Sequence, residues 1–398
     1  MQQQFEEEIG EAPLLEDVTL LDYYHGMLPK IETEEMLTER GDFLLRKTDG
    51  SDYGTVVVLS VKTEPKVTKH FMLSMDPQGR FYFEGHKENS VPELIDYHLN
   101  QKKPITKASG ALLVRPVKHP PWMINHEHVV IVKKLGEGAF GEVYLAELQI
   151  PPEDKTKPME IIRVAVKTMR QTASRDGRLV FMKEARMMRK YNHKNVVKIN
   201  GIAVHEHPIL IVMEVCPNGS LLSYLRKNKG KLSVAEKMKF VVEAADGLAY
   251  LERQACIHRD IAARNCLLSE KNEIKISDFG MSDDRLLIVD TTLEKTPVKW
   301  LAPEAMQDKI YSLKTDIWAF GVMVWEIFAD GAEPYPGLSN LQTRAKIVVH
   351  DYRMKMPEGT PQAVIDVVDM CWKKDPDARK TMASHFKNLK DCMDKLPK

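Results

Sequence analysis

Three short polar segments in the second half of the chain constrain its fold more than any other feature. They are HRDIAARN (258–265), DFG (278–280) and APE (302–304). In the first, Asp260 is suited to accept the proton of a hydroxyl group. The side-chain oxygens of Asn265 and Asp278 suit a hard divalent cation. A chance match over all eight residues of the first segment is implausible, so we expect a fold that brings these side chains around one ligand.

A glycine-rich segment, LGEGAFGEV, occupies residues 135–143 and contains the spacing GxGxxG. In a dinucleotide-binding unit such a loop joins a strand to a helix. Here β-like residues stand on both sides, at 129–133 and 143–148, which predicts a strand–loop–strand hairpin. Glycines let backbone N–H groups approach phosphate oxygens closely. By itself, however, this spacing is also compatible with an ordinary glycine-rich hairpin.

A lysine and a glutamate follow the glycine-rich segment. Lys167 ends the short apolar strand VAVK (164–167). Phe181, Glu184 and Met188 recur at helical spacing, which places Glu184 on the buried face of a predicted helix. A buried carboxylate is costly unless it is paired, and Lys167 is the natural partner. Such a pair would hold the lysine ammonium against the α- and β-phosphates of ATP.

With these motifs in order, residues 129–390 resemble the protein kinase catalytic domain. The resemblance implies Asp260, Arg264, Lys167 and Glu184 as catalytic residues. It implies Asn265 and Asp278 as ligands of Mg²⁺, with Mn²⁺ as an alternative, and ATP as the nucleotide. The nucleotide-binding residues implied are Leu135, Gly136, Glu137, Gly138, Ala139, Phe140, Gly141, Val143, Ala165, Lys167, Met213, Glu214 and Leu267.

Two features resemble tyrosine kinases more than serine/threonine kinases. Arg264 stands four residues after Asp260, and Ala262 occupies the position where serine/threonine kinases usually carry lysine. The segment PVKW (297–300) resembles the tyrosine-kinase substrate platform. The resemblance also implies that Glu304 pairs with Arg379, that Asp316 anchors the backbone of the catalytic loop, and that Met213 and residues 214–219 form the gatekeeper and hinge.

Residues 22–117 resemble an SH2 domain, through YYHG (23–26) and GDFLLRKT (41–48). Arg46 lies in an apolar strand, so it is expected to point inward and to need an anion; a guanidinium binds phosphate in bidentate geometry. By this resemblance Lys30, Arg46, Thr48 and His70 bind phosphotyrosine. Lys30 stands where most such domains have arginine, so weaker binding is expected. An arginine paired with a core carboxylate is the structural alternative.

The organisation expected is an α+β multidomain chain: an SH2 fold, with an antiparallel sheet flanked by two helices, followed by a bilobal protein kinase fold. The boundaries are an acidic tail (1–21), the SH2 domain (22–117), a linker (118–128), the kinase domain (129–390) and a C-terminal tail (391–398). Helices are expected near 33–40 and 92–99, and strands near 55–61, 70–74 and 80–83.

Composition limits the partners and the compartment. Lys and Arg total 57, as do Asp and Glu, so neither nucleic-acid binding nor an electrostatic membrane anchor is expected. Five cysteines without a CxxC pair favour reduced thiols in the cytoplasm, with recruitment to membranes, junctions or the nucleus through partners. We expect no membrane span and no signal peptide, and Gln2 excludes N-myristoylation.

The whole arrangement most resembles the Fes/Fer family, supported by DFGMS (278–282) and LSNLQTR (338–344). Members usually carry an N-terminal F-BAR region, for which the first 21 residues leave no room. They also autophosphorylate a tyrosine between DFG and APE, whereas this segment has no tyrosine and the corresponding position holds Asp290. One hypothesis is that Asp290 partly replaces the phosphate; the other is that it is an ordinary solvated loop residue.

Three functions follow from this reading. The first is a tyrosine kinase acting on protein substrates, with an SH2 domain that binds phosphotyrosine-containing proteins and supports the active state. The second is an SH2 adaptor with a catalytically weak kinase domain, which the intact Lys167, Asp260 and Asp278 disfavour. The third is a dual-specificity or serine/threonine kinase, which Ala262 and Arg264 disfavour.

Overall fold

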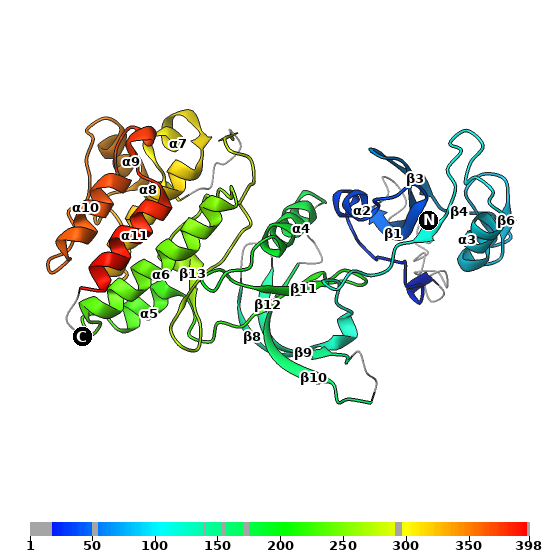
Figure 1. Ribbon diagram of the computed structural model, residues 1–398, viewed down its shortest axis with the longest axis horizontal. Coiled ribbons are helices and arrows are strands. Elements are labelled where there is room, and N and C mark those ends of the chain that lie inside the picture. The colour runs from blue at the N-terminus through cyan, green and yellow to red at the C-terminus, as the bar shows by residue number, and fades with distance from the viewer. Residues whose placement is uncertain are drawn as a thin grey trace, which may run out of the picture. The chain divides into compact units, whose positions relative to one another are not determined.

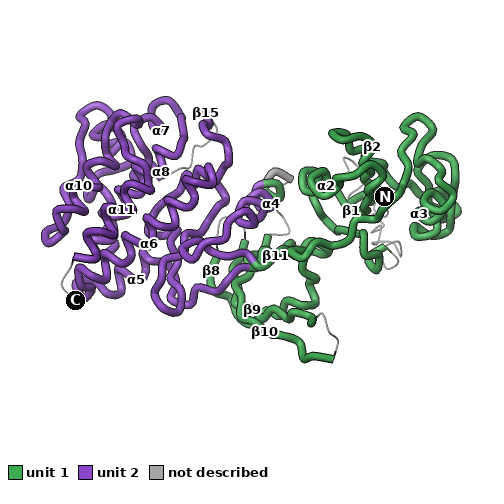
Figure 2. Tube along the Cα trace, viewed as in Figure 1, with its two compact units in different colours: residues 1–179, 200–212 green, residues 180–199, 213–398 purple. Residues whose placement is uncertain are grey.

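The computed structural model describes residues 18–49, 55–137, 141–152, 156–169, 175–290 and 297–395. The chain divides into two compact units (Figure 2). Unit 1 comprises residues 1–179 and 200–212, and unit 2 comprises residues 180–199 and 213–398.

The N-terminal part of unit 1 has a four-stranded sheet in the order β3-β2-β1-β7, a small sheet β4-β5-β6, and helices α2 and α3 (Figure 1). The bounds are α2 Lys30–Met36, β1 Asp42–Asp49, β2 Thr55–Glu64, β3 Val67–Met72, β4 Ser74–Met75, β5 Phe81–Tyr82, β6 Lys87–Glu88, α3 Val91–Asn100 and β7 Arg115–Pro116. β1 runs antiparallel to β2 and parallel to β7.

The core of this part forms on one face of the sheet. Phe43 and Leu45 of β1, Leu59 and Val61 of β2 and Leu94 of α3 belong to one buried cluster. Alternate strand residues point to opposite faces, so the other face of β1 is free to carry polar side chains. The fold expected for this part, a sheet flanked by two helices, is confirmed; the strands are antiparallel except for β7, which joins β1 in parallel.

The predicted helix near 33–40 lies earlier, at Lys30–Met36. Pro29, at its N-cap, has the extended backbone that precedes a helix. The chain leaves the helix at Leu37 because the amides of Thr38 and Glu39 donate hydrogen bonds to the carboxylate of Asp42, at 3.1 and 2.8 Å. A side-chain acceptor thus ends the helix, which residue periodicity could not indicate.

Four other predicted elements also have shifted bounds, among them the strand expected at 55–61, which is β2, Thr55–Glu64. The helix expected at 92–99 is α3, Val91–Asn100, capped by Ser90. The strands expected at 70–74 and 80–83 are β3, Val67–Met72, and β5, Phe81–Tyr82. Leu73 lies outside the strands, although its amide still donates to the carbonyl of Val57, at 2.9 Å.

The second sheet has five strands in the order β11-β12-β10-β9-β8. The bounds are β8 Val129–Glu137, β9 Glu142–Ile150, β10 Glu160–Thr168, β11 Ile199–Ala203 and β12 Leu210–Glu214. Within unit 1 its core comprises Ala146, Leu148, Val164, Val166 and Val212, with other small apolar residues. The linker is part of this sheet's edge, because the amide of Ile124 donates to the carbonyl of Ile202 and that of Ile202 donates to the carbonyl of Trp122, both at 2.9 Å.

Unit 2 is largely helical. Its elements are the part of α4 (Arg175–Arg189) from residue 180 onward, α5 Leu221–Lys227, α6 Val234–Arg253, β13 Cys266–Leu268, β14 Ile274–Ile276, β15 Ile288–Val289, α7 Pro303–Asp308, β16 Ile310–Tyr311, α8 Leu313–Phe328, α9 Asn340–Val348, α10 Gln362–Cys371 and α11 Met382–Met393, with single 3₁₀ turns at Ala263–Asn265, Val298–Trp300 and Pro376–Ala378. A further 3₁₀ turn, His126–His128, precedes β8 in unit 1.

Helix α8 is the central element of unit 2, since every residue from Thr315 to Phe328 is buried. A helix that is apolar on all sides belongs in the interior of a domain. The two carboxylates of this helix, Asp316 and Glu326, are buried, so they must be hydrogen-bonded. Sequence reasoning expected a strand-rich part followed by a helical part within the kinase region, and this architecture is confirmed.

Candidate active site

In unit 1, strand β9 lies between Gly136 on β8 and Lys167 on β10. In the ladder Val143 of β9 is the partner of Gly136 on β8 and of Lys167 on β10. A Cβ added at Gly136 would meet nothing within 4 Å, so the backbone there is open to a ligand. Lys167 is nevertheless buried, with 9% of its surface exposed. The ladder thus aligns Lys167 with Gly136 across the intervening strand β9.

The other described nucleotide-binding residues predicted in unit 1 lie on the same strands, except Gly141, which directly precedes β9. Leu135 and Glu137 end β8, and Ala165 pairs with Leu145 on the neighbouring strand. Three predicted residues, Gly138, Ala139 and Phe140, lie outside the described residues.

In unit 2 the carboxylate of Asp260 is oriented by its neighbours in the catalytic loop. Its Oδ1 accepts a hydrogen bond from Nη2 of Arg264, and its Oδ2 accepts one from Nδ2 of Asn265 at 2.7 Å. Asn265 Nδ2 also donates to the carbonyl of Asp260, at 2.8 Å. The carboxylate is therefore held in one orientation while it keeps lone pairs for an incoming hydroxyl group.

The predicted metal ligands are linked through the backbone. The carbonyl of Asn265 accepts bonds from the amide of Ser277 at 2.9 Å and from its hydroxyl at 2.8 Å, and Ser277 directly precedes Asp278. Because the amide nitrogen of Asn265 is committed to Asp260, its side-chain oxygen is the atom left for a cation. One amide oxygen and one carboxylate suit Mg²⁺, which retains water and phosphate ligands.

The predicted hinge runs beside strand β13. The amide of Leu268 donates to the carbonyl of Gly219 at 2.9 Å, and Met213 and Leu267 both pack against the main core of unit 2. Glu214 accepts a bond from the amide of Lys198 at 2.7 Å and forms an ion pair with Lys275 at 2.9 Å. Glu214 is thus connected to Leu267 through Lys275, the ladder partner of Leu267.

Helix α4 carries Glu184, which is buried with 2% of its surface exposed. The same helix is tied to the segment after DFG, since Lys183 pairs with Asp283 at 3.1 Å and Lys190 with Asp284 at 2.6 Å. The bond from Arg285 and that from Lys183 hold the pKa of Asp283 well below its usual range, despite partial burial.

Two buried residues hold the catalytic loop and the APE segment, as the resemblance implied. The carboxylate of Asp316 accepts bonds from the amides of His258 and Arg259, at 2.6 and 2.9 Å, while burial raises its pKa to about 6. Glu304 forms a bidentate pair with Arg379, at 2.7 and 2.9 Å. Both predictions are confirmed.

The predicted phosphotyrosine residues gather on the polar face of the N-terminal sheet. Nε of Arg46 donates to Oγ of Ser60 at 3.3 Å, and that oxygen lies 2.9 Å from Nδ1 of His70. Arg46 is buried as expected, but on the face opposite to the one that carries Phe43 and Leu45, so it does not enter the apolar core. Thr48 lies further along the same strand.

Sequence reasoning missed Glu34 in this pocket. Its Oε1 lies 3.3 Å from Nε2 of His70 and 3.6 Å from Nζ of Lys30, so three of the pocket's polar side chains already interact with one another. The only signal in the sequence was its helical spacing from Lys30, at i and i+4.

Within unit 1 the SH2-like part also contacts the kinase-like sheet. The amide of Met27 donates to the carbonyl of Val204 at 2.8 Å. Gly26 has a φ of +52°, and an added Cβ would meet the same carbonyl oxygen at 2.3 Å, so only glycine fits there. Its own carbonyl accepts the amide of Lys47, next to Arg46, at 2.6 Å. Gly26 thus contacts both strand β1, which carries Arg46, and the segment that joins β11 and β12.

Comparison with known proteins agrees with both parts of the chain. Residues 129–389 match the family model for protein tyrosine and serine/threonine kinases, and residues 23–98 match that for the SH2 domain. Fer-related kinase 1 of Caenorhabditis elegans is 58% identical over 385 residues, which cover 96% of each chain. The chain belongs to the Fer family of tyrosine-protein kinases.

Other relatives in the family are longer. The tyrosine-protein kinase Fer of Rattus norvegicus is 40% identical over 386 residues, which are 96% of this chain but 44% of that protein. The transforming protein Fps of an avian sarcoma virus is 39% identical over 370 residues, 92% of this chain and 67% of that protein. The chain therefore spans less than half the length of Fer itself.

Membership in the Fer family confirms the predicted fold class, the SH2 and kinase domains and the enzyme class. A protein kinase domain uses ATP with a divalent cation and acts on protein substrates, and an SH2 domain binds phosphotyrosine-containing partners. Among the described residues, none of the helices is both long and apolar enough to cross a membrane.

A second residue that sequence reasoning missed is Glu326 of helix α8. Its Oε2 accepts bonds from the amide of Ala263 in the catalytic loop and from Nε1 of Trp300 in the substrate platform, both at 3.0 Å. Burial raises the pKa of Glu326 to about 7. This carboxylate therefore joins the loop that carries Asp260 to the segment before APE. An acidic residue in an otherwise apolar helix was its only signal in the sequence.

Glu326→Ala is expected to lower the free energy of unfolding by roughly 2–4 kcal/mol, because two donors lose their acceptor. Glu326→Gln keeps a carbonyl oxygen for both donors.

The stability that Glu326 contributes should also depend on pH. Its folded-state pKa of about 7 exceeds the ordinary value of 4.5, so this stability is complete below pH 4.5 and lost as the pH rises through 7. Urea unfolding of wild type and both variants at pH 6 and 8 measures this. The free energy of unfolding of Glu326→Gln, relative to that of wild type, should be higher at pH 8 than at pH 6. Equal losses for alanine and glutamine would contradict this.

Glu34→Gln is expected to strengthen phosphotyrosine binding about fivefold, because the Glu34 carboxylate competes with phosphate for Lys30 and His70. An exposed charge interaction of this kind amounts to about 1 kcal/mol. Glu35→Gln is the matched control, since Glu35 is an exposed residue of the same helix and its replacement changes the net charge equally. Calorimetric titration with a phosphotyrosine peptide measures both variants, and equal gains would indicate a general charge effect instead.

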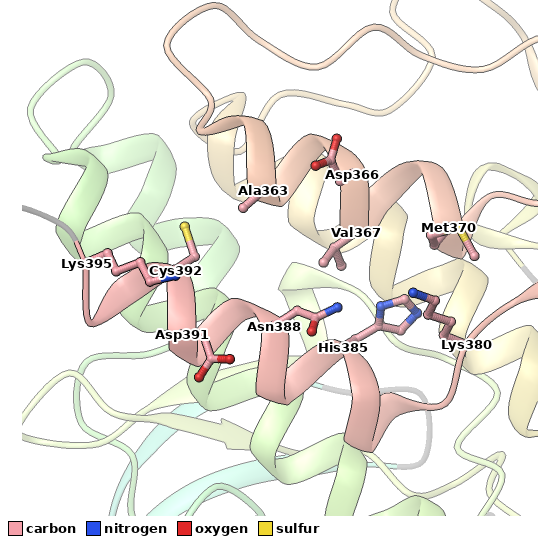
Figure 3. Close-up of a pocket in the computed structure, with 10 residues that line it drawn as sticks. All are labelled: Ala363, Asp366, Val367, Met370, Lys380, His385, Asn388, Asp391, Cys392 and Lys395. Carbon is pink, nitrogen blue, oxygen red and sulfur yellow. The ribbon is translucent and has the colours of Figure 1, made fainter.

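A separate cavity of about 490 Å³ lies between helices α10 and α11 of unit 2 (Figure 3). Its lining includes Asp366 and Met370 from α10 and His385 and Asp391 from α11. None of its lining residues is among the predicted catalytic, nucleotide-binding, metal-binding or phosphotyrosine-binding residues, so we assign the cavity no part in catalysis.

Proposed function

We propose that the chain transfers the γ-phosphoryl group of ATP to tyrosine side chains of proteins, and that its SH2 domain binds phosphotyrosine with Lys30, Arg46, Thr48 and His70. The observation that carries the proposal is the carboxylate of Asp260, held by Arg264 and Asn265 in a loop whose backbone is bonded to a buried aspartate. That arrangement suits a group that orients an acceptor hydroxyl and takes its proton.

In this proposal catalysis rests on positioning and charge. Asp260 aligns the phenol of the substrate, while Lys167, supported by Glu184, and the backbone of the glycine-rich hairpin bind the phosphates. Asn265 and Asp278 are the proposed ligands of Mg²⁺, which when bound neutralises charge on the β- and γ-phosphates. Met213, Glu214, Leu267, Leu135, Val143 and Ala165 are proposed to contact the remainder of the nucleotide.

Tyrosine as the acceptor is supported by the contacts of the substrate platform. The guanidinium of Arg264 lies over the ring of Trp300, with Cζ 4.5 Å from its centroid, and Lys299 pairs with Glu333 at 2.8 Å. Arg264 therefore links the catalytic carboxylate to the platform through a cation–π contact. Serine/threonine kinases usually carry a lysine at the position that Ala262 occupies in this chain.

The SH2 domain is proposed to support the active kinase. The bond between Met27 and Val204, and the close fit of Gly26 on the same segment, give phosphopeptide binding a physical route to the kinase sheet. The bound ligand would shift the kinase between two states only to the extent that it binds them with different affinity.

The domain boundaries 22–117 and 129–390 remain part of this proposal, as does a cytoplasmic location. All five cysteines are free thiols, which suits a reducing compartment. Recruitment to membranes, junctions or the nucleus would depend on phosphotyrosine-containing partners.

The purified full chain should phosphorylate poly(Glu,Tyr) with labelled ATP and Mg²⁺, and should leave serine-containing polymers unlabelled. Repeating the assay with Mn²⁺ in place of Mg²⁺ tests whether Mn²⁺ also supports the reaction. Labelling of serine polymers would favour a dual-specificity enzyme. Binding of a phosphotyrosine peptide without any phosphoryl transfer would favour an SH2 adaptor.

A further inference from the structure

The segment between DFG and APE is joined to the rest of unit 2 by a short strand pair. Ile288–Val289 of β15 pairs antiparallel with Ile310–Tyr311 of β16. The amide of Asp290, the next residue, donates to the carbonyl of Lys309 at 3.1 Å. The backbone therefore delivers Asp290 to a defined position.

At that position the carboxylate of Asp290 meets Arg259. Nη2 of Arg259 lies 2.8 Å from Oδ2 of Asp290, and the two side chains are 6% and 21% exposed. The guanidinium also lies over the ring of Tyr311, with Cζ 4.3 Å from its centroid. A buried guanidinium is costly without an anion, so the pair stabilises this arrangement of the segment.

Arg259 is one residue before Asp260, and its own amide is bonded to Asp316 at 2.9 Å. An anion that fixes the side chain of Arg259 therefore also restrains the backbone that carries the carboxylate of Asp260. Many kinases order this segment by phosphorylation, through a new pair between arginine and a phosphorylated residue. This chain has no tyrosine between Asp278 and Glu304.

We infer that Asp290 is a positioning residue which permanently supplies to Arg259 the negative charge that phosphorylation supplies elsewhere, so that this kinase is active without phosphorylation of the segment. The inference rests on the proposed kinase activity. The replacement is partial, because a carboxylate carries one charge against about −1.5 to −2 for phosphotyrosine. In keeping with this, Nε of Arg259 is buried without a partner among the described residues.

The test is a kinetic comparison of variants of the full chain. Asp290→Asn should lower kcat roughly tenfold, within the usual range of coupling between sites, and leave the KM for ATP nearly unchanged. Asp290→Glu should retain most activity, since it keeps the charge. Asp308→Asn is the matched control, because Asp308 is exposed at the end of α7 and should behave as wild type.

Phosphatase treatment separates a permanent charge from a phosphorylated one. Treated wild type should show linear progress curves from the start. Asp290→Tyr should begin slowly and accelerate during incubation with ATP, as the new tyrosine becomes phosphorylated. Wild-type kcat in Asp290→Asn, or loss of wild-type activity after phosphatase, would overturn the inference. So would equal losses of kcat and thermal stability in the asparagine and glutamate variants.

Hydrogen exchange gives a readout that does not require turnover. The amides of Val289 and Asp290 should exchange faster in Asp290→Asn than in wild type, and unchanged exchange would refute the ordering role. Absence of kinase activity in wild type would overturn the proposed function instead, whereas active wild type with an equally active asparagine variant would overturn only the role of Asp290.

Discussion

Replacing Asp260 by asparagine is expected to lower kcat for poly(Glu,Tyr) on the order of 10³-fold, the largest effect of any single change proposed for this kinase. In the proposed mechanism this carboxylate takes the proton of the acceptor hydroxyl, and such a group contributes about 10²- to 10⁴-fold. The KM for ATP should change little, because Asp260 contacts the acceptor and not the nucleotide in the proposed mechanism. Steady-state kinetics at saturating Mg²⁺ measure both constants.

The fold of the Asp260 variant must be checked because its side chain has two partners. Asparagine has one acceptor oxygen, so it can keep the bond from Asn265 or the bond from Arg264, but not both. Thermal unfolding should therefore show only a modest loss of stability. Asp369→Asn, an exposed change on α10, is the matched control. A kcat within tenfold of wild type would rule out Asp260 as the proton acceptor.

Replacing Arg46 by lysine is expected to weaken binding of a phosphotyrosine peptide on the order of 10- to 100-fold. Lysine keeps the charge but loses the fork geometry, and one charge-assisted hydrogen bond is worth about 1.5–3 kcal/mol. Nε of Arg46, which is bonded to Ser60, also has no counterpart in lysine. Calorimetric titration with phosphorylated and unphosphorylated forms of one peptide measures the loss specific to the phosphate.

Arg40→Lys is the matched control for Arg46, since Arg40 is exposed and outside the pocket. If the SH2 domain supports the active state, the phosphopeptide should raise turnover of wild type and of the control, and do so in Arg46→Lys only at much higher concentration. A peptide that binds wild type without changing turnover would contradict the coupling. Unchanged peptide affinity in Arg46→Lys would contradict the assignment of the pocket itself.

The motifs of the active site could be predicted from sequence because each is short and chemically constrained. Asp260 and Asn265 are five residues apart, so the loop that joins them fixes their proximity almost regardless of the remainder of the chain. The bonds of Asp316 and the pair of Glu304 with Arg379 were also expected, but through resemblance and not through any periodicity. Resemblance thus supplied the long-range contacts that local patterns could not.

Glu34 and Glu326 were missed for a physical reason. Each has a weak local signal, but its decisive partner is brought close only by folding, His70 for Glu34 and Ala263 for Glu326. Glu326 sits 63 residues from Ala263, whose amide it accepts. The helix near 33–40 was misplaced for a related reason, since the carboxylate of Asp42, beyond the predicted helix, ends it by accepting the amides of Thr38 and Glu39.

The amino-acid sequence by itself determined the family and the two domains and predicted the catalytic groups, because hydroxyl activation, metal binding and phosphate binding each require particular side chains at close spacing. Only the tertiary structure decided what those groups meet. It gave Arg259 the carboxylate of Asp290, His70 that of Glu34, and the segment at Val204 a close contact with Gly26. Charge pairing and steric fit depend on distances between chain segments, and these distances exist only once the chain has folded.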